Sequence, residues 1–561
     1  MSSIKQLNRF VKNPVTISIQ RSKFKRPFGH KTTFKSGKLI PIFLDEVIAG
    51  DTFKLDMASV VRMLTPVVPV MDNAFLDIYF FYVPNRLCTV HSDDWQKISG
   101  ENKGGYWAPS SESTLENTGN TLCPSDYGWY IARDSVPAYF GLPIGDWTSD
   151  STVYKDTIAI NIMPFIGYTK IWNEFFRDQN TQPPVVINSD YDVYTKYFVN
   201  DSCLPVNKLH DYFCSALPAP QKGDAVLLPI AGSAPVITSS SPTVTGTHQP
   251  IRFLRTNTGL PVQGAVTIKG NDVGGAQMEV DGTVPNMGQA VYPSNLYADL
   301  QNATAVSVNE MRQAIAIQRM LEKDARGGTR YREMLQAHFG VTIPDLTVQV
   351  PEYLAGKRVP LNVTQVLQTS QTDNTPLGTT GAFSNTSFSD YMFTKSFNEA
   401  GYVIGVACVR TEQSYSQGVA KLWTRNRRYD WYDPTFANLG EQAVFKRELY
   451  MEHISVGGQT AWKEVFGYQE AWAEYRYHPN LITGALAPNA GMANFTAWTY
   501  TNNFNASPIL NSAFMVQPSS QIGDTLVVTN TLEQFVADFY FDLTCVRPMP
   551  LYSIPGLMDH H

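Results

Sequence analysis

Cysteine is scarce in this chain, with six residues in 561. No two cysteines form a C-x-x-C motif, and none has a histidine at the spacing of a zinc finger. These absences exclude a disulfide-stapled scaffold and a zinc site of recognisable spacing. We therefore expect reduced thiols that are mostly buried. The cysteines are Cys88, Cys123, Cys203, Cys214, Cys408 and Cys545.

Long apolar runs are missing as well. No stretch approaches the roughly 18 apolar residues that a membrane-spanning helix requires. The first residues hold no apolar segment behind a basic start, so a secretory signal is not expected. The sequence therefore predicts a protein that is made and assembled in a cytosol.

Motifs that carry chemistry are absent too. The chain has no phosphate-binding glycine loop, dinucleotide fingerprint, zincin helix, nucleophile elbow or EF-hand loop. His210 stands beside Asp211, but neighbours in a strand point to opposite faces, and no nucleophile motif accompanies them. The acid pairs at 45–46 and 93–94 lack metal-ligand spacing, although a metal ion held by several loops would leave no sequence signal. We expect no enzyme activity and no cofactor, and we leave a metal ion open.

Charge is low at 17 %, whereas aromatic residues reach 12 % and proline and glycine number 35 and 38. Many turns, many aromatic side chains and few charges favour a β-rich protein with long loops and large buried contacts. The segment 36–87 carries the clearest strands, expected at 39–44, 53–63 and 75–83. Gly50 can supply the positive φ of a tight turn between the first two. The sequence predicts that this block seeds a large β-sandwich.

Further elements follow along the chain. Residues 88–163 and 341–392 are expected to be loops. Helices are expected at 164–180, 307–326 and 330–339, and further strands at 401–409, 443–450 and 535–546. The apolar residues expected to line the inner side of the 307–326 helix are Val308, Met311, Ile315, Ile317, Met320 and Leu321.

The charge is unevenly distributed. Residues 1–44 hold ten lysines or arginines and no acid, so the rest of the chain carries 34 basic and 50 acidic residues out of 44 and 50 in total. Residues 1–35 are predicted to form a basic arm. One interpretation is contact with nucleic-acid phosphates, and the other is an arm against a neighbouring subunit with solvated charges. The candidate nucleic-acid-binding residues are Lys5, Arg9, Lys12, Arg21, Lys23, Lys25 and Arg26.

Composition shifts again after residue 230. Residues 231–300 are rich in Gly, Ser, Thr, Pro, Asn and Val and contain short alternating pieces such as AVTIKG and AQMEVDG. Such a segment is typical of an inserted surface excursion with small strands of its own and variable recognition. We therefore divide the chain into the arm at 1–35, a core at 36–223 and 304–561, and an inserted surface protrusion at 224–303.

Several long strings stand out along the chain. They are GKLIPIFLDEVIAGDTFKL at 37–55, MDNAFLDIYFFYVPNRL at 71–87, IWNEFFRDQN at 171–180, KLHDYFCSALPAPQKG at 208–223, LEKDARGGTRYREMLQAHFGV at 321–341, PEYLAGKR at 351–358, GYVIGVACVR at 401–410, LGEQAVFKRELY at 439–450, FGYQEAWAEYRYHPNLITG at 466–484 and CVRPMPLYSIPGLMDH at 545–560. These strings resemble the major capsid proteins of the gokushoviruses, small single-stranded DNA phages of the microvirus family. The resemblance spans nearly the whole chain and weakens only in 224–303.

The resemblance implies a mainly β fold: an eight-stranded antiparallel jelly-roll sandwich with long inserted loops and a few helices. It implies a virion protein, assembled in the cytoplasm of a bacterial host, whose copies close into a small icosahedral shell around circular single-stranded DNA. The implied partners are a pilot or minor capsid protein and a small basic DNA-packaging protein. The insertion at 224–303 would cluster at three-fold axes as a protrusion and meet a host surface receptor.

Two functions from other classes remain open at this point. One is a carbohydrate-binding β-sandwich, which the basic arm and the missing secretory signal weigh against. The other is a single-stranded DNA-binding protein acting outside a shell, which would be a monomer or small oligomer whose affinity falls steeply with salt.

Overall fold

The chain divides into two compact units, Met1–Pro220 with Asp324–His561 and, between them in sequence, Gln221–Lys323. A computed structural model describes residues 20–88, 121–122, 130–146, 160–199, 203–226, 236–238, 251–255, 261, 265–270, 276–281, 291–298, 308–371, 377–378, 380–451, 464–488, 495–527 and 533–552.

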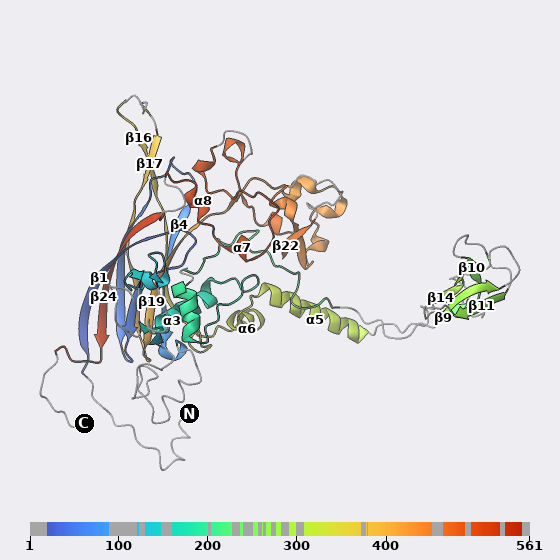
Figure 1. Ribbon diagram of the computed structural model, residues 1–561, viewed down its shortest axis with the longest axis horizontal. Coiled ribbons are helices and arrows are strands. Elements are labelled where there is room, and N and C mark those ends of the chain that lie inside the picture. The colour runs from blue at the N-terminus through green and yellow to red at the C-terminus, as the bar shows by residue number, and fades with distance from the viewer. Residues whose placement is uncertain are drawn as a thin grey trace, which may run out of the picture. The chain divides into compact units, whose positions relative to one another are not determined.

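Two four-stranded antiparallel sheets dominate the first unit (Figure 1). The first sheet has the order β1 (Ser22–Phe34), β24 (Phe535–Arg547), β3 (Thr52–Met63) and β18 (Thr386–Ser396). The second has the order β15 (Glu352–Pro360), β4 (Ala74–Pro84), β19 (Gly401–Thr411) and β2 (Ile40–Val47). Successive long strands along the chain therefore alternate between the sheets, except for the step from β4 to β15.

The two sheets face each other across one apolar core. In β24, every second side chain from Phe535 to Cys545 is buried, which matches the two-residue period of a strand with one face exposed to solvent. The ring of Phe541 lies 5.1 Å from that of Phe43 on β2 and 6.4 Å from that of Phe80 on β4, measured between centroids. Such aromatic contacts between facing sheets make a β-sandwich. The prediction of a mainly β sandwich with few helices is confirmed.

The strands of the 36–87 block are confirmed as β2, β3 and β4. Gly50 adopts a φ of 92°, as the turn between β2 and β3 was expected to require. The strands expected at 401–409 and 535–546 are confirmed as β19 and β24. Only residues 443–445 of the strand expected at 443–450 form a strand, because β21 (Glu441–Phe445) pairs with β22 (Val465–Glu470) and then ends in a 3-10 turn.

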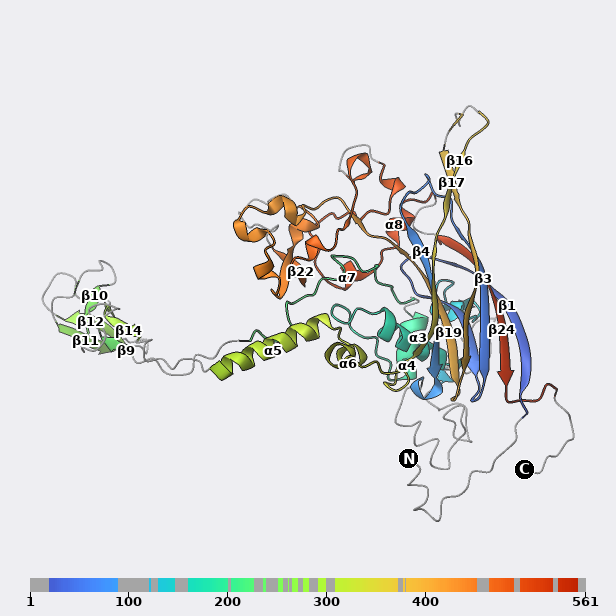
Figure 2. The ribbon, with the colours of Figure 1, turned by 180° about the vertical axis from the view of Figure 1, so that it is seen from behind.

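Two predicted irregular segments contain strands. The segment 341–392 was expected to be a loop, which is wrong, because it holds β15, β16 (Val363–Leu367), β17 (Thr380–Ser384) and most of β18. The arm expected at 1–35 is wrong in its second half, where residues 22–34 form β1 at the edge of the first sheet (Figure 2). These are edge strands or hairpin strands with a largely exposed face, so their sequences lack the apolar run that marked β4.

The predicted helices form with adjusted ends. The helix expected at 164–180 is α3 (Met163–Ile171), continued as a π-helix, η4 (Trp172–Phe176), and both are packed into the core. The helices expected at 307–326 and 330–339 are α5 (Val308–Arg326) and α6 (Tyr331–Phe339). Gly340 ends α6 with a φ of 69°, the left-handed conformation typical of a helix C-terminus.

The apolar face of α5 is exposed, so its predicted burial is wrong. Val308, Met311 and Ile315 are 66 %, 44 % and 48 % exposed in the protomer. Ile317 and Met320 are also exposed. Helical periodicity shows which side chains share a face, but it does not show whether another element covers that face.

The described residues of the second unit include three pairs of short strands and most of α5. The pieces AVTIKG and AQMEVDG form β11 (Ala265–Gly270) and β12 (Ala276–Asp281), which pair with each other. Two further pairs join β10 (Phe253–Arg255) to β13 (Val291–Pro293) and β9 (Val236–Thr238) to β14 (Leu296–Ala298).

The remaining strands and α-helices of the first unit are short. They are β5 (Thr121–Leu122), β6 (Tyr130–Ile131), β7 (Gly145–Asp146), β8 (Ile160–Asn161), β20 (Ser414–Tyr415), β23 (Asn480–Leu481), α2 (Val136–Tyr139), α4 (Asp190–Val193), α7 (Ser512–Met515) and α8 (Ser520–Gly523).

Candidate functional site

The basic residues singled out in the sequence fall into two groups. Lys5, Arg9 and Lys12 lie outside the described residues. Arg21 is exposed immediately before β1, and Lys23, Lys25 and Arg26 lie on β1 itself. The structure therefore places four of the seven candidates at the start of one edge strand.

Strand alternation sends these side chains to two faces. Lys23 and Lys25 point to the outer sheet face, which we define as the side of the β1-β24-β3-β18 sheet turned away from the second sheet. Lys25 is 66 % exposed and its Nζ lies 3.2 Å from a carboxylate oxygen of Asp542. Exposed pairs of this kind contribute little to stability, so the lysines remain available to an anion.

Arg26 has a different role. Its guanidinium group donates a 2.7 Å hydrogen bond to Asp45 on β2, which joins the edges of the two sheets. Burial opposes the charged form, but the neighbouring Asp45 carboxylate outweighs it and raises the pKa of Arg26. Arg26 is thus engaged within the protomer, which the sequence could not show.

The outer sheet face carries more cations than β1 alone provides. The register aligns β1 with β24 and β3, which brings Lys54 and Arg62 of β3 to the same face. Tyr391 and Tyr540 are about half exposed there, and Lys54 Nζ lies 5.9 Å from the ring centroid of Tyr391. Cations interleaved with exposed rings are the composition that single-stranded nucleic acids bind. The cations on this face are Lys23, Lys25, Lys31, Lys54 and Arg62, and the acids are Asp56, Asp538 and Asp542.

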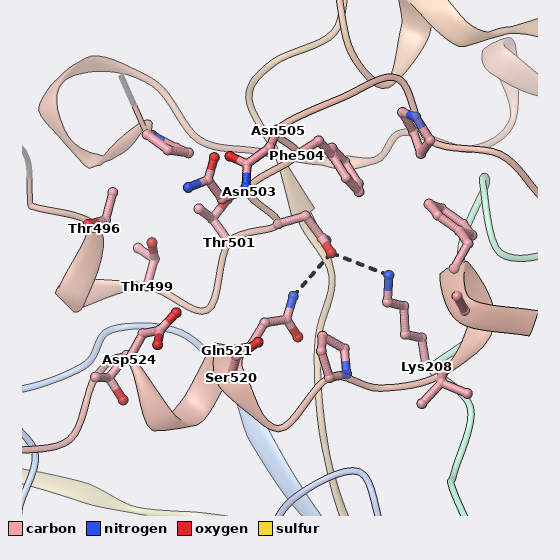
Figure 3. A pocket seen from close by; sticks show the side chains of 18 of the residues that line it. Lys208, Thr496, Thr499, Thr501, Asn503, Phe504, Asn505, Ser520, Gln521 and Asp524 are labelled. Atoms are coloured by element: carbon pink, nitrogen blue, oxygen red, sulfur yellow. Dashed lines mark hydrogen bonds between the residues drawn. The ribbon is translucent and has the colours of Figure 1, made fainter. Parts of the chain in front are cut away.

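A polar pocket of about 740 Å³ lies beside α7 and α8 (Figure 3). Lys208 enters it from one side, while Asp524 lies on the other side. Asn502 and Gln521 of the lining form a buried amide network with Gln413, with Gln521 Nε2 donating to Asn502 Oδ1 at 3.1 Å. The lining is dominated by neutral hydroxyl and amide side chains. These include Thr496, Thr499, Thr501, Asn503, Asn505 and Asn511.

An exposed aromatic surface lies on the loops that follow β20 and β22. Trp423 is 78 % exposed, and Arg425 stacks 4.4 Å above the ring centroid of Tyr475. Trp, Tyr and Arg are the side chains most enriched where protein surfaces bind each other. We define the aromatic surface by Leu422, Trp423, Tyr429, Trp431, Tyr475, Tyr477 and Leu481, each of them exposed in the protomer.

The residues that resembled a catalytic pair in the sequence, His210 and Asp211, do not form one in the structure. Asp211 accepts a 2.6 Å hydrogen bond from the Tyr415 hydroxyl and a 2.7 Å bond from the Cys214 amide, while His210 is exposed. Within the described ranges, no three His, Cys, Asp or Glu side chains are grouped as a metal ion would require. Asp93 and Asp94 lie outside those ranges.

The described cysteines are free and buried, as expected, and Cys123 lies outside the described residues. Burial raises the pKa of the Cys88 thiol to about 12, which keeps it protonated and unreactive. The helices of the described residues include none that is long and apolar enough to cross a membrane.

Comparison with known proteins assigns the chain to a family. Residues 13–557 match the family described as "Capsid protein (F protein)". The chain is 38 % identical over 551 residues to "Capsid protein VP1" of Bdellovibrio phage phiMH2K, covering 96 % of each chain. It is 35 % identical to the proteins of the same name in Chlamydia phage 1, covering 98 % of each chain, and in Spiroplasma virus 4, covering 96 % of each. The chain therefore belongs to the phage F-type capsid protein family, in its gokushovirus branch, and it is a major capsid protein and not an enzyme.

Proposed function

We propose that copies of this chain fold as eight-stranded jelly rolls and close into a small icosahedral shell around circular single-stranded DNA. The observation that carries the proposal is the strand order, β1-β24-β3-β18 facing β15-β4-β19-β2. The first long strand pairs with the last, and the chain passes back and forth between the sheets, as in paired Greek keys. Membership of a capsid family supports the shell.

Particle morphology tests this proposal directly. The purified chain, viewed by negative-stain microscopy and sedimented, should form closed particles of uniform size that protect circular single-stranded DNA from nuclease. Monomers or small oligomers that bind DNA with a steep salt dependence would instead favour a DNA-binding protein acting outside a shell.

The outer sheet face is proposed to line the inside of the shell. Together with the residues that precede β1 in sequence, it is proposed to contact the genome. Support comes from the exposed Lys23 and Lys25, which share this face with Tyr540, and from the ten basic residues within the first 44. The double variant Lys23→Gln with Lys25→Gln should form particles that contain less DNA, because phosphate contacts are lost.

The matched control for this variant is Arg319→Gln with Lys323→Gln, which removes two exposed cations from α5. Particles of the control should contain the wild-type amount of DNA, measured by absorbance ratio and phosphate content. Equal DNA contents in both double variants would contradict the assignment of the outer sheet face.

The insertion at 224–303 is proposed to form a protrusion at three-fold axes and to bind a host surface receptor. Support comes from its place within a compact unit of its own, Gln221–Lys323, built of short strands and loops. Replacing 231–295 by a short Gly/Ser linker should leave assembly intact and abolish attachment to host cells. Loss of soluble protomer would show that the segment belongs to the folding core.

Two further virion components are proposed, a pilot or minor capsid protein and a small basic DNA-packaging protein. The chain carries a net charge of −6, so it brings no excess of positive charge with which to neutralise a genome. Assembly in the cytoplasm of a bacterial host accords with the buried, free thiols of the described residues. Mass spectrometry of particles from infected cells should identify both components, and particles lacking any small basic chain would contradict this.

A further inference from the structure

We propose that the pocket around Lys208 receives a carboxylate group from a second copy of this chain. The inference goes beyond the proposals above and rests only on the shell-building role of the family. It begins from a lysine whose ammonium group is buried and makes no ion pair with a carboxylate of the described residues.

Lys208 is 4 % exposed, and its backbone amide is fixed by a 2.8 Å hydrogen bond to the carbonyl of Met515 at the end of α7. Its ammonium group donates a single 3.4 Å hydrogen bond, to Oδ1 of Asn502, and lies 4.4 Å from the ring centroid of Phe514. An ammonium group has three protons to donate, so this hydrogen bond leaves two of them without an acceptor among the described residues.

No carboxylate oxygen of the described residues lies within 4.0 Å of the Lys208 ammonium group. The other buried lysine of those residues, Lys421, has Glu474 at 3.8 Å. Burial lowers the pKa of Lys208, and the more distant Asp211 carboxylate opposes this shift without cancelling it. Buried charges are normally paired, so a buried ammonium group in a pocket wall without an ion pair indicates a partner from outside the protomer.

The pocket suits a peptide better than a nucleic-acid backbone. Lys208 is the one cation among its described lining residues, and Asp524 on the other side would repel a run of phosphates. The Thr and Asn side chains between them offer neutral donors and acceptors, which main-chain amides and carbonyls can satisfy. A volume of about 740 Å³ accommodates several residues of an extended segment.

A second copy is the occupant that the chain itself favours. Outside its first 44 residues the chain holds 50 acidic against 34 basic residues, so neighbouring copies bring an excess of carboxylates to their contacts. Subunits of a closed shell meet in fixed orientations, so one contact can place one carboxylate in every pocket.

A cross-linking experiment tests the proposal. Particles assembled from equal amounts of ¹⁴N- and ¹⁵N-labelled full-length chain are treated with a water-soluble carbodiimide, which joins an amine to a carboxylate already in contact with it. Peptides containing Lys208 should be linked to an Asp or Glu peptide, and about half of the linked pairs should carry mixed labels. Links with uniform labels only, links to another virion protein, or no Lys208 link would overturn the proposal.

A variant supplies a second, independent measurement. Lys208→Met should raise the thermal midpoint of the unassembled protomer, because it removes an unpaired buried charge, and should lower particle yield at least tenfold. The matched control Lys421→Met should lower the protomer midpoint, because it removes a paired charge and leaves Glu474 with one fewer partner. A lowered thermal midpoint for Lys208→Met, or an unchanged particle yield, would contradict the proposal. If that variant does not fold, the cross-linking experiment alone tests the proposal.

Discussion

A buried carboxylate ties three neighbouring strands of the second sheet together, and its removal should have a large and specific cost. Asp77 on β4 is fully buried. It accepts hydrogen bonds of 2.6 and 3.0 Å from Arg358 on β15 and of 2.8 Å from Arg410 on β19. The hydrogen bond to Asp77 raises the pKa of the Arg358 guanidinium group above its ordinary value.

The variant Asp77→Asn keeps the shape of the side chain and removes its charge. The Arg410 side chain is only 14 % exposed, so it would be left as an uncompensated buried cation, which costs about 3–5 kcal/mol. The Arg358 side chain is 46 % exposed and can turn toward water, so its lost pair adds about 1 kcal/mol at most. We therefore expect Asp77→Asn to lower the free energy of unfolding by about 4 kcal/mol.

Urea unfolding of the unassembled protomer, followed by tryptophan fluorescence, measures this loss. Lys357→Met is the control, because it breaks an exposed ion pair with Asp390 and should cost less than about 1 kcal/mol. The double variant Asp77→Leu with Arg410→Met removes both charges and should recover most of the stability. A loss below about 1 kcal/mol for Asp77→Asn, or a double variant as unstable as the single one, would refute the reasoning.

Three further predictions follow from other parts of the protomer. Burial lowers the pKa of Lys208 in the folded protomer, so the unfolded chain binds the proton of this lysine more tightly. The stability of the protomer should therefore rise with pH between the pKa of Lys208 in the folded protomer and the pKa of an exposed lysine, about 10.4. Thermal midpoints measured across this range should show a smaller rise in Lys208→Met, and identical profiles would contradict the burial of a charged lysine. Trp423→Ala on the aromatic surface should leave the protomer midpoint unchanged, since the side chain is 78 % exposed, but should raise the concentration required for assembly about tenfold. An unchanged assembly threshold by light scattering would exclude Trp423 from the contacts. Deleting residues 1–19 should leave a protomer that is folded, as measured by circular dichroism. Deleting residues 1–30 removes most of β1 and should make the chain insoluble. Equal solubility of the two truncated chains would show that β1 is dispensable.

The central strands and the helices were accessible from sequence because their signals are local. β4 is almost continuously apolar, and every second residue of β24 is apolar from Phe535 to Cys545, so each strand can be identified without knowing its neighbour. The ends of α5 and α6 follow from glycines that stop a helix. The long strings shared with gokushovirus capsid proteins likewise pointed to the family that the comparisons established.

The edge strands could not be predicted in this way. β1 is mostly polar and exposed, so its sequence resembles that of a basic arm, and only pairing with β24, about 500 residues away in sequence, makes it a strand. The same pairing decides which basic residues are available. Lys25 and Arg26 are adjacent in sequence, yet one faces outward and the other is engaged by Asp45.

The sequence by itself determined the mainly β class, the family, the places of the helices and most buried strands, and the excess of positive charge near the beginning of the chain. Only the tertiary structure decided the sheet order, the outer sheet face, the burial of Lys208 and the exposure of the apolar side of α5. The physical reason is that periodicity is a property of a short segment, whereas the partner of a charge or of an apolar face comes from segments that are distant in sequence and become neighbours only on folding.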